Sequence, residues 1–213
     1  MARSYRGWLI AIALVGAMAD QASKYVVFGW LHNHPTRYDR ISGTGSYEII
    51  PHAFRLHVQY TGDRPTNWLQ TWSSSDELPR VNQGALFGLG NQHAVAANYF
   101  FALVSVVAGV AIIGFSFRPG TARDRWLCLS LGLILAGTLG NLYDRIVFQG
   151  VRDFLYYYYL VDWPVFNVAD CCLVCGAFVL LGQAFLTNPA GKPVASPAVE
   201  TVPLPAAEIV NAN

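Results

Sequence analysis

Hydrophobic residues gather in four long blocks along this chain, and the polar residues lie mainly between these blocks. The blocks cover residues 7–30, 95–117, 126–145 and 165–187. Each holds at least ~20 residues, which at about 1.5 Å of helix per residue is enough to cross the hydrocarbon core of a bilayer. The pattern therefore predicts an all-α membrane protein with four transmembrane helices.

The segment 31–94, between the first and second blocks, has a different pattern. Short runs with strand character, at 47–50 and 54–60, are separated by Gly, Pro, Asn and Ser. Such runs broken by turn-forming residues are typical of antiparallel strands. We therefore expect a small extracytoplasmic β-containing domain between transmembrane helices 1 and 2.

The charges next to the blocks predict how the chain crosses the membrane. The turn 118–125 contains three arginines, and Arg3 and Arg6 precede the first block. Basic residues in short loops remain on the cytoplasmic side. The segment 146–164, rich in aromatic residues, is then an extracytoplasmic loop. Residues 188–213, which contain five prolines and no periodicity, read as a disordered cytoplasmic tail.

The first block also has features of a cleavable signal peptide. Arg3 and Arg6 precede the apolar run, and the residues at 17–19 read Ala-Met-Ala, which resembles a cleavage site. However, the apolar run continues beyond Asp20 through 25–28, which a signal peptide does not need. We therefore interpret the block as an uncleaved helix.

The composition excludes several classes of function. The chain is 54% hydrophobic and 13% charged, with a net charge of +1, against about 25% charged residues in a soluble domain. Without a basic cluster, we expect no nucleic-acid partner. The four cysteines lie in apolar blocks and are interpreted as packing residues. The C-x-x-C pair at Cys172 and Cys175 lacks a second ligand pair, so we expect no metal and no cofactor.

Three aspartates near the last two blocks are candidates for chemistry, because ionisable groups in membrane helices are costly unless they are paired or used. Counting about 1.5 Å per residue from Trp126 and Thr187 places Asp144 and Asp170 at nearly the same level, close to the outer surface. The loop that carries Asp153 is short enough to fold back toward them. All three carboxylates are therefore expected to converge.

Several neighbouring side chains suit such a site. Asn141 and Asn167 offer amide donors, Arg145 can pair with a carboxylate, and Gly137 allows close helix approach. A purely structural interpretation is also open: Asp144 and Arg145 could form an ion pair, and Asn167 and Asp170 could cap the fourth helix after Pro164.

Two aspartates held close together cannot both ionise easily, so one of them keeps a proton near neutral pH. The ionised member can take a proton from water while the other protonates a carbonyl oxygen, which is amide hydrolysis without a covalent intermediate. We expect Asp170, near a helix N-terminus, to be the base, and Asp153 to be the acid. The five histidines lie between residues 32 and 93, away from these aspartates.

Five motifs resemble those of lipoprotein signal peptidase (signal peptidase II), in the family's order and over about residues 7–187. The motifs are Asp20-Gln21-Ala22-Ser23-Lys24, Asn82-x-Gly84-Ala85-x-Phe87-Gly88, Gly140-Asn141-x-x-Asp144-Arg145, Val151-x-Asp153-Phe154 and Phe166-Asn167-x-Ala169-Asp170. The resemblance implies a four-helix aspartyl endopeptidase of the bacterial inner membrane. Its substrates would be diacylglyceryl-modified prolipoproteins, cut at the lipobox cysteine to remove the signal peptide.

The resemblance also assigns roles to residues. It implies that the catalytic pair is Asp153 and Asp170, whereas counting depth alone pairs Asp144 with Asp170; we follow the resemblance. The implied substrate-binding residues are Asn82, Asn141, Arg145 and Asn167. The implied structural residues are Asp20, Lys24, Gly137, Asp144 and Ala169.

The resemblance further implies a multi-pass protein of the bacterial cytoplasmic membrane, with its active site near the extracytoplasmic face and both termini in the cytoplasm. Its expected partners are prolipoproteins, membrane lipid and globomycin-type inhibitors, and we expect a monomer. The region 31–95 looks longer than the family usually has, with 63–80 as the expected insertion, and the tail 188–213 is also extra. They leave the choice of substrate open.

Two other functions are compatible with a polar membrane protein. A transporter would show helices broken in mid-membrane and internal repeats. Here the third and fourth blocks are unbroken, and the deep pair Asp20 and Lys24 is spaced to neutralise itself. A non-catalytic membrane scaffold held together by polar residues is the second alternative.

Overall fold

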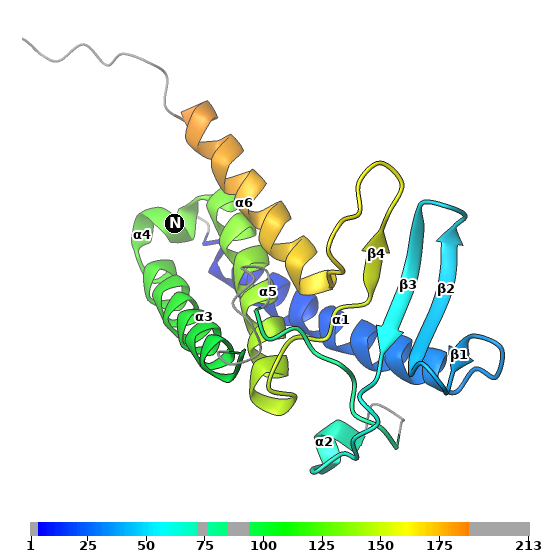
Figure 1. Cartoon of the computed structure of the whole chain (residues 1–213). Coiled ribbons are helices and arrows are strands. Elements are labelled where there is room, and N and C mark those ends of the chain that lie inside the picture. The colour runs from blue at the N-terminus through cyan, green and yellow to red at the C-terminus, as the bar shows by residue number, and fades with distance from the viewer. Residues whose placement is uncertain (1–3, 72–75, 85–93, 188–213) are drawn as a thin grey trace, which may run out of the picture.

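The protein is described by a computed structural model that covers residues 4–71, 76–84 and 94–187 (Figure 1). The four longest helices in the described residues are α1 (Arg6–His32), α3 (Ala94–Ser116), α5 (Arg125–Val147) and α6 (Val168–Thr187). All four are long and apolar enough to cross a membrane. The described residues therefore contain the four long apolar helices that the sequence predicts. The tail 188–213 and motif residues 85–88 lie outside the described part of the chain.

Helix α5 is the centre of the helical bundle, with α1, α3 and α6 around it (Figure 1). In its most apolar window 56% of the residues are buried within the protein, whereas the figure is 11–17% for the other three helices. The apolar faces of α1, α3 and α6 are therefore free to contact lipid. At Gly137 of α5, an added Cβ would lie 2.3 Å from the carbonyl oxygen of Ala169 in α6. Glycine thus permits this close packing.

Beside the bundle lies a four-stranded antiparallel sheet in the order β1-β2-β3-β4. Its strands are β1 (Tyr38–Asp39), β2 (Thr44–Ile50), β3 (Phe54–Gln59) and β4 (Leu155–Tyr157). The first three come from the segment where the sequence predicts strands. The fourth comes from the connection between α5 and α6, where no strand was expected. The sheet is thus shared by the two long loops, and it ties them to each other.

The sheet is fixed to the end of α1 by a small apolar core of Phe28, Leu31, Val58, Tyr60 and Phe154. The Tyr60 hydroxyl donates a hydrogen bond of 2.8 Å to the carbonyl oxygen of Phe28. Phe154 is buried here, and its chain neighbour is Asp153. The core therefore helps to fix where Asp153 lies.

Helix α6 begins three residues later than the predicted block, which starts at residue 165. The reason is that Phe166 is extended: its backbone exchanges hydrogen bonds of 2.8 and 2.9 Å with Leu155 of β4. Two short helices, α2 (Trp68–Thr71) and α4 (Pro119–Arg123), lie in the long and the short connection respectively. In α2, the side chain of Gln70 donates to the carbonyl oxygen of Val147 at 2.8 Å, so this part of the 63–80 stretch packs on the end of α5.

Candidate functional site

Asp153 and Asp170 approach each other at the junction of the bundle and the sheet. Asp153 lies between α5 and β4, and Asp170 lies in the first turn of α6. The Asn167 side chain donates to Asp153 Oδ1 at 2.6 Å, and its backbone N–H donates to Asp170 Oδ2 at 3.2 Å. One buried asparagine therefore contacts both carboxylates, which are themselves only partly buried.

Two further asparagines complete this arrangement. Asn82 Nδ2 donates to Asp153 Oδ2 at 3.1 Å, and Asn141 Nδ2 donates to Asp170 Oδ1 at 2.9 Å. Asn82 is itself held by a pair of backbone hydrogen bonds to Val151, of 2.7 and 2.9 Å. Each carboxylate thus accepts amide hydrogens on both of its oxygens, which fixes its orientation.

The surroundings of Asp153 favour its protonated form. Burial raises the pKa of Asp153, the neighbouring charge of Asp170 raises it further, and the result is a pKa of about 7. The hydrogen bonds from Asn82 and Asn167 act in the opposite direction but are outweighed. Near neutral pH, the pair of carboxylates can therefore both hold and release a proton.

A second cluster, which is charged and fully buried, adjoins the aspartate pair between α1, α5 and the start of α6. Lys24 Nζ lies 2.8 Å from Asp20 Oδ2 and 3.1 Å from Asp144 Oδ2. Arg152 Nη2 lies 2.8 Å from Asp144 Oδ1, and the Arg152 backbone N–H donates to Asp144 Oδ2 at 2.9 Å. All four side chains are 0% exposed. Two cations and two anions balance one another, as burial requires.

This cluster also holds parts of the aspartate site in place. Lys24 Nζ donates to Asn141 Oδ1 at 3.3 Å, and Asp20 Oδ1 accepts the backbone N–H of Ala169 at 2.9 Å. Ala169 is fully buried and adjoins Asp170 in the chain. The cluster therefore positions both Asn141 and the start of α6.

The contacts of Asp144 differ from those of the purely structural interpretation of the sequence. Asp144 pairs with Lys24 and Arg152 and not with Arg145, so the alternative of an Asp144–Arg145 ion pair is wrong. Counting depth paired Asp144 with Asp170, but it could not show that two cations contact the Asp144 carboxylate and that Asn141 contacts Asp170.

Arg145 lies beside the aspartates without a direct hydrogen bond to either of them in the described contacts. Its Nη1 donates to the Asn141 carbonyl oxygen at 3.4 Å, and the guanidinium lies 5.4 Å from the centre of the Phe101 ring. The charge of Arg145 is thus available to another group. Within the described residues, no three His, Cys, Asp or Glu side chains gather where they could hold a metal ion.

Sequence reasoning missed Arg152 of the buried cluster and Gln21, which contacts the cluster. Arg152 Nη2 donates to Gln21 Oε1 at 2.8 Å, and Gln21 Nε2 donates to Asp144 Oδ1 at 3.2 Å. Arg152 occupies the variable position of the Val151-x-Asp153-Phe154 motif, and Gln21 directly follows Asp20. An arginine that adjoins a candidate catalytic aspartate in an otherwise apolar run was the signal that could have identified Arg152.

Comparisons with known proteins agree over most of the chain. Residues 76–186 match the family model described as Signal peptidase (SPase) II. A lipoprotein signal peptidase from Pseudomonas putida is 37% identical over 193 residues, which cover 88% of this chain and 90% of that protein. One from Anaeromyxobacter is 40% identical over 187 residues, covering 84% and 86%. One from Rhodopirellula baltica is 42% identical over 118 residues, and the chain spans only about half of its length, 51%.

Solved structures share the fold. A bacterial membrane enzyme determined by the in meso method at 2.3 Å resolution superposes with a TM-score of 0.63 at 24% identity, covering 92% of this chain and 98% of that one. A second structure, at 1.9 Å resolution, gives a TM-score of 0.62 at 23% identity, covering 88% and 98%. The arrangement of helices and sheet is therefore one already seen in a membrane enzyme.

Proposed function

The chain belongs to the signal peptidase II family, and we propose that it is an aspartyl endopeptidase that cuts diacylglyceryl-modified prolipoproteins at the lipobox cysteine. The observation that carries this proposal is the pair Asp153 and Asp170, both hydrogen-bonded to Asn167. The family is a peptidase family, and two coupled carboxylates are sufficient chemistry for peptide hydrolysis.

In the proposed mechanism, Asp170 is the base and Asp153 the acid. Asp170 takes a proton from water as the water oxygen attacks the scissile carbonyl carbon, and Asp153 gives its proton to the carbonyl oxygen. When the tetrahedral intermediate collapses, the C–N bond breaks, and the proton on Asp170 passes to the leaving nitrogen. Asp153 regains a proton from the intermediate's hydroxyl group. No covalent enzyme intermediate forms.

The asparagines and Arg145 are proposed to line the substrate site. Asn82, Asn141 and Asn167 hold the two carboxylates in fixed orientations, which lowers the reorganisation needed during reaction. Arg145 makes no direct hydrogen bond to the carboxylates in the described contacts, so its guanidinium is proposed to bind a backbone carbonyl of the substrate.

A framework role is proposed for the residues behind the site. They are Asp20, Lys24, Gly137, Asp144 and Ala169. The buried ion pairs fix α1 and α5 relative to the start of α6, and the small residues Gly137 and Ala169 allow α5 and α6 to touch.

We further propose that the site opens at the extracytoplasmic end of the bundle. Arg6 Nε donates to the Ser116 carbonyl oxygen at 3.1 Å, so the basic N-terminus and the arginine-rich turn 118–125 lie at one end of the helices. Basic residues favour the cytoplasmic side. The aspartates lie toward the sheet, at the other end. A lipidated substrate helix could then enter the site laterally from the bilayer, and its scissile bond would remain accessible to water.

The proposal predicts that the purified protein, reconstituted in lipid, cuts a diacylglyceryl-modified prolipoprotein immediately before its cysteine. The same prolipoprotein without the lipid is the control and is expected to be cut far more slowly, because the lipid places the cysteine at the level of the aspartates. Gel shift and product mass measure both reactions. No cleavage of the lipidated form by folded protein would refute the proposed activity.

The pKa of Asp153 predicts how the rate depends on pH. If Asp153 is the acid, its protonated form is required, and the active fraction falls as pH rises through about 7. Cleavage measured between pH 5.5 and 9 at substrate concentrations well below KM should therefore decline on the alkaline side, by about tenfold for each unit well above the pKa. A rate that rises steadily across this window would mean that both carboxylates act ionised.

A further inference from the structure

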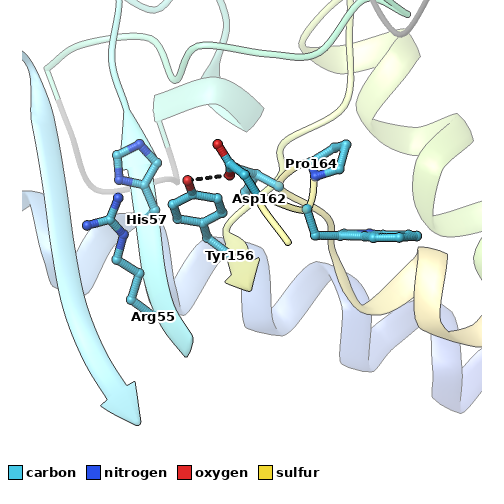
Figure 2. Close-up of a pocket in the computed structure, with 7 residues that line it drawn as sticks. Arg55, His57, Tyr156, Asp162 and Pro164 are labelled. Atoms are coloured by element: carbon cyan, nitrogen blue, oxygen red, sulfur yellow. Dashed lines mark hydrogen bonds between the residues drawn. The ribbon is translucent and has the colours of Figure 1, made fainter. Parts of the chain in front are cut away.

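A hollow lies on the sheet, and none of the aspartates or asparagines of the candidate site lines it. Its volume is about 390 Å³, within the range of pockets that hold small ligands. Strand β3 contributes Arg55 and His57, β4 contributes Tyr156, and the segment that leads into α6 contributes Asp162 and Trp163 (Figure 2). Residues from three separate parts of the chain therefore build it.

One wall of the hollow carries two polar atoms that lack hydrogen-bond partners. The Nε atom of Arg55 and the Nδ1 atom of His57 are buried without a hydrogen-bond partner among the described residues. The Arg55 guanidinium lies against two neighbouring rings, 4.8 Å from the centre of Tyr156 and 5.0 Å from that of Tyr158. Buried polar atoms are nearly always satisfied, so an acceptor-rich ligand is expected here. Guanidinium groups and phosphates are well matched.

The other wall carries a negative charge. Tyr156 donates to Asp162 Oδ1 at 2.6 Å, and Figure 2 shows Tyr156 lying between Arg55 and Asp162. No ion pair joins Arg55 to Asp162 in the described part of the chain. A cation and an anion are thus held apart across one tyrosine ring. The complementary ligand is a zwitterion whose own charges are separated by a few bonds.

The hollow lies where a membrane surface is expected. Its lining ends at Val165, three residues before α6 begins. The loop beside it exposes apolar and aromatic side chains, with Tyr159 66%, Leu160 77% and Trp163 56% exposed. Aromatic residues at the end of a membrane helix lie at the level of lipid headgroups. The nearest source of a zwitterionic phosphate is therefore the bilayer itself.

We propose that this hollow binds the phosphoethanolamine headgroup of a membrane phospholipid. The phosphate oxygens accept hydrogen bonds from Arg55 and His57, and the ammonium group lies against Asp162 and the Trp163 ring. A lipid bound here anchors the sheet to the bilayer next to the segment that leads to Asn167. The binding does not depend on the proposed peptidase activity.

Native mass spectrometry of the full-length protein in detergent tests this proposal, with lipids titrated in. The probes are dioleoyl phosphatidylethanolamine, dioleoyl phosphatidylglycerol, which lacks the ammonium group, and soluble glycerophosphoethanolamine, which lacks the acyl chains. The variants are Arg55→Gln and Asp162→Asn, and the matched controls Arg40→Gln and Asp63→Asn change exposed residues outside the hollow. Because binding is read without turnover, an inactive protein can still be tested.

The wild type is expected to bind phosphatidylethanolamine about tenfold or more tightly than phosphatidylglycerol. Arg55→Gln should weaken binding of both lipids, and Asp162→Asn should remove only the preference between them. Equal affinity for the two lipids, or variants that match their controls, would overturn the proposal. Soluble glycerophosphoethanolamine binding as tightly as the lipid would show that the occupant is a soluble phosphoester. Because Asp162 lies in an exposed loop, Asp162→Asn tests the proposal even if Arg55→Gln fails to fold.

Discussion

Asp153→Asn and Asp170→Asn are each expected to lower the rate of prolipoprotein cleavage by about a thousandfold or more. Asparagine keeps the shape but only one acceptor oxygen, so one of the two amide hydrogen bonds at each position can persist and the other is lost. What is lost is the ability to take or give a proton. The rate is measured as the gel shift of a lipidated prolipoprotein, and Asp63→Asn, at an exposed position, serves as the matched control.

The stability of Asp153→Asn shows whether its activity is lost because a catalytic group is missing or because the fold is damaged. The pKa of Asp153 is raised from 3.8 to about 7, so the folded protein holds this proton more tightly than the unfolded chain. The contribution of protonated Asp153 to the free energy of unfolding is therefore fully present below pH ~4 and is lost as pH rises through about 7. The variant has no such proton to lose. Its melting temperature should exceed that of the wild type at pH 8.5, and the difference should shrink at pH 5.

A different pattern of activities would contradict the assignment of Asp153 and Asp170 as the catalytic pair. If Asp153→Asn still cleaves while Asp144→Asn is folded and inactive, the pair predicted by counting depth is the catalytic one, and the roles implied by the motifs do not apply to this chain. If all three variants retain activity, the chemistry does not use these carboxylates.

The helices could be predicted from the sequence because membrane helices are local features. A run of about 20 apolar residues must satisfy its backbone hydrogen bonds within itself, so length and composition alone define it. The same reasoning placed Asp144 and Asp170 at nearly one level, and in the structure Asp170 accepts a hydrogen bond of 2.9 Å from Asn141, three residues before Asp144.

The sheet could be predicted only in part because strand pairing is not local. Three strands lie in one segment, but β4 pairs with β3 across about 100 residues of chain, and a short run of tyrosines does not reveal its partner. This pairing is what fixes Asp153: the His57 backbone N–H donates to the Phe154 carbonyl oxygen at 2.9 Å. Counting helical rise cannot place such a residue.

The burial of Arg152 among charged partners was also not predicted. The chain turns back immediately after α5 ends at Val147, with Gln149 at a positive φ of 60°. This turn returns Arg152 to Asp144, eight residues earlier. In sequence it resembled an ordinary charged loop residue, because the fold alone brings four charged side chains together.

Asp144→Asn is expected to destabilise the protein by about 3–5 kcal/mol, because removing one partner leaves buried charge uncompensated. Asp144 contacts both Lys24 and Arg152, and neither of these cations is exposed to water. The measurement is thermal unfolding in detergent, compared with Asp63→Asn. A large fall in melting temperature is expected, in contrast to Asp153→Asn.

A double variant shows whether charge balance is the cause. Arg152→Met alone leaves one excess anion in the cluster, whereas Asp144→Asn with Arg152→Met leaves the Lys24–Asp20 pair balanced. If unpaired charge is what destabilises, the double variant loses less stability than the sum of the two single variants. Strict additivity would mean that packing, not charge, dominates at this position. At temperatures where Asp144→Asn is still folded, it should retain cleavage, because a residue that only positions Asn141 and α6 can be lost without removing the proton transfers.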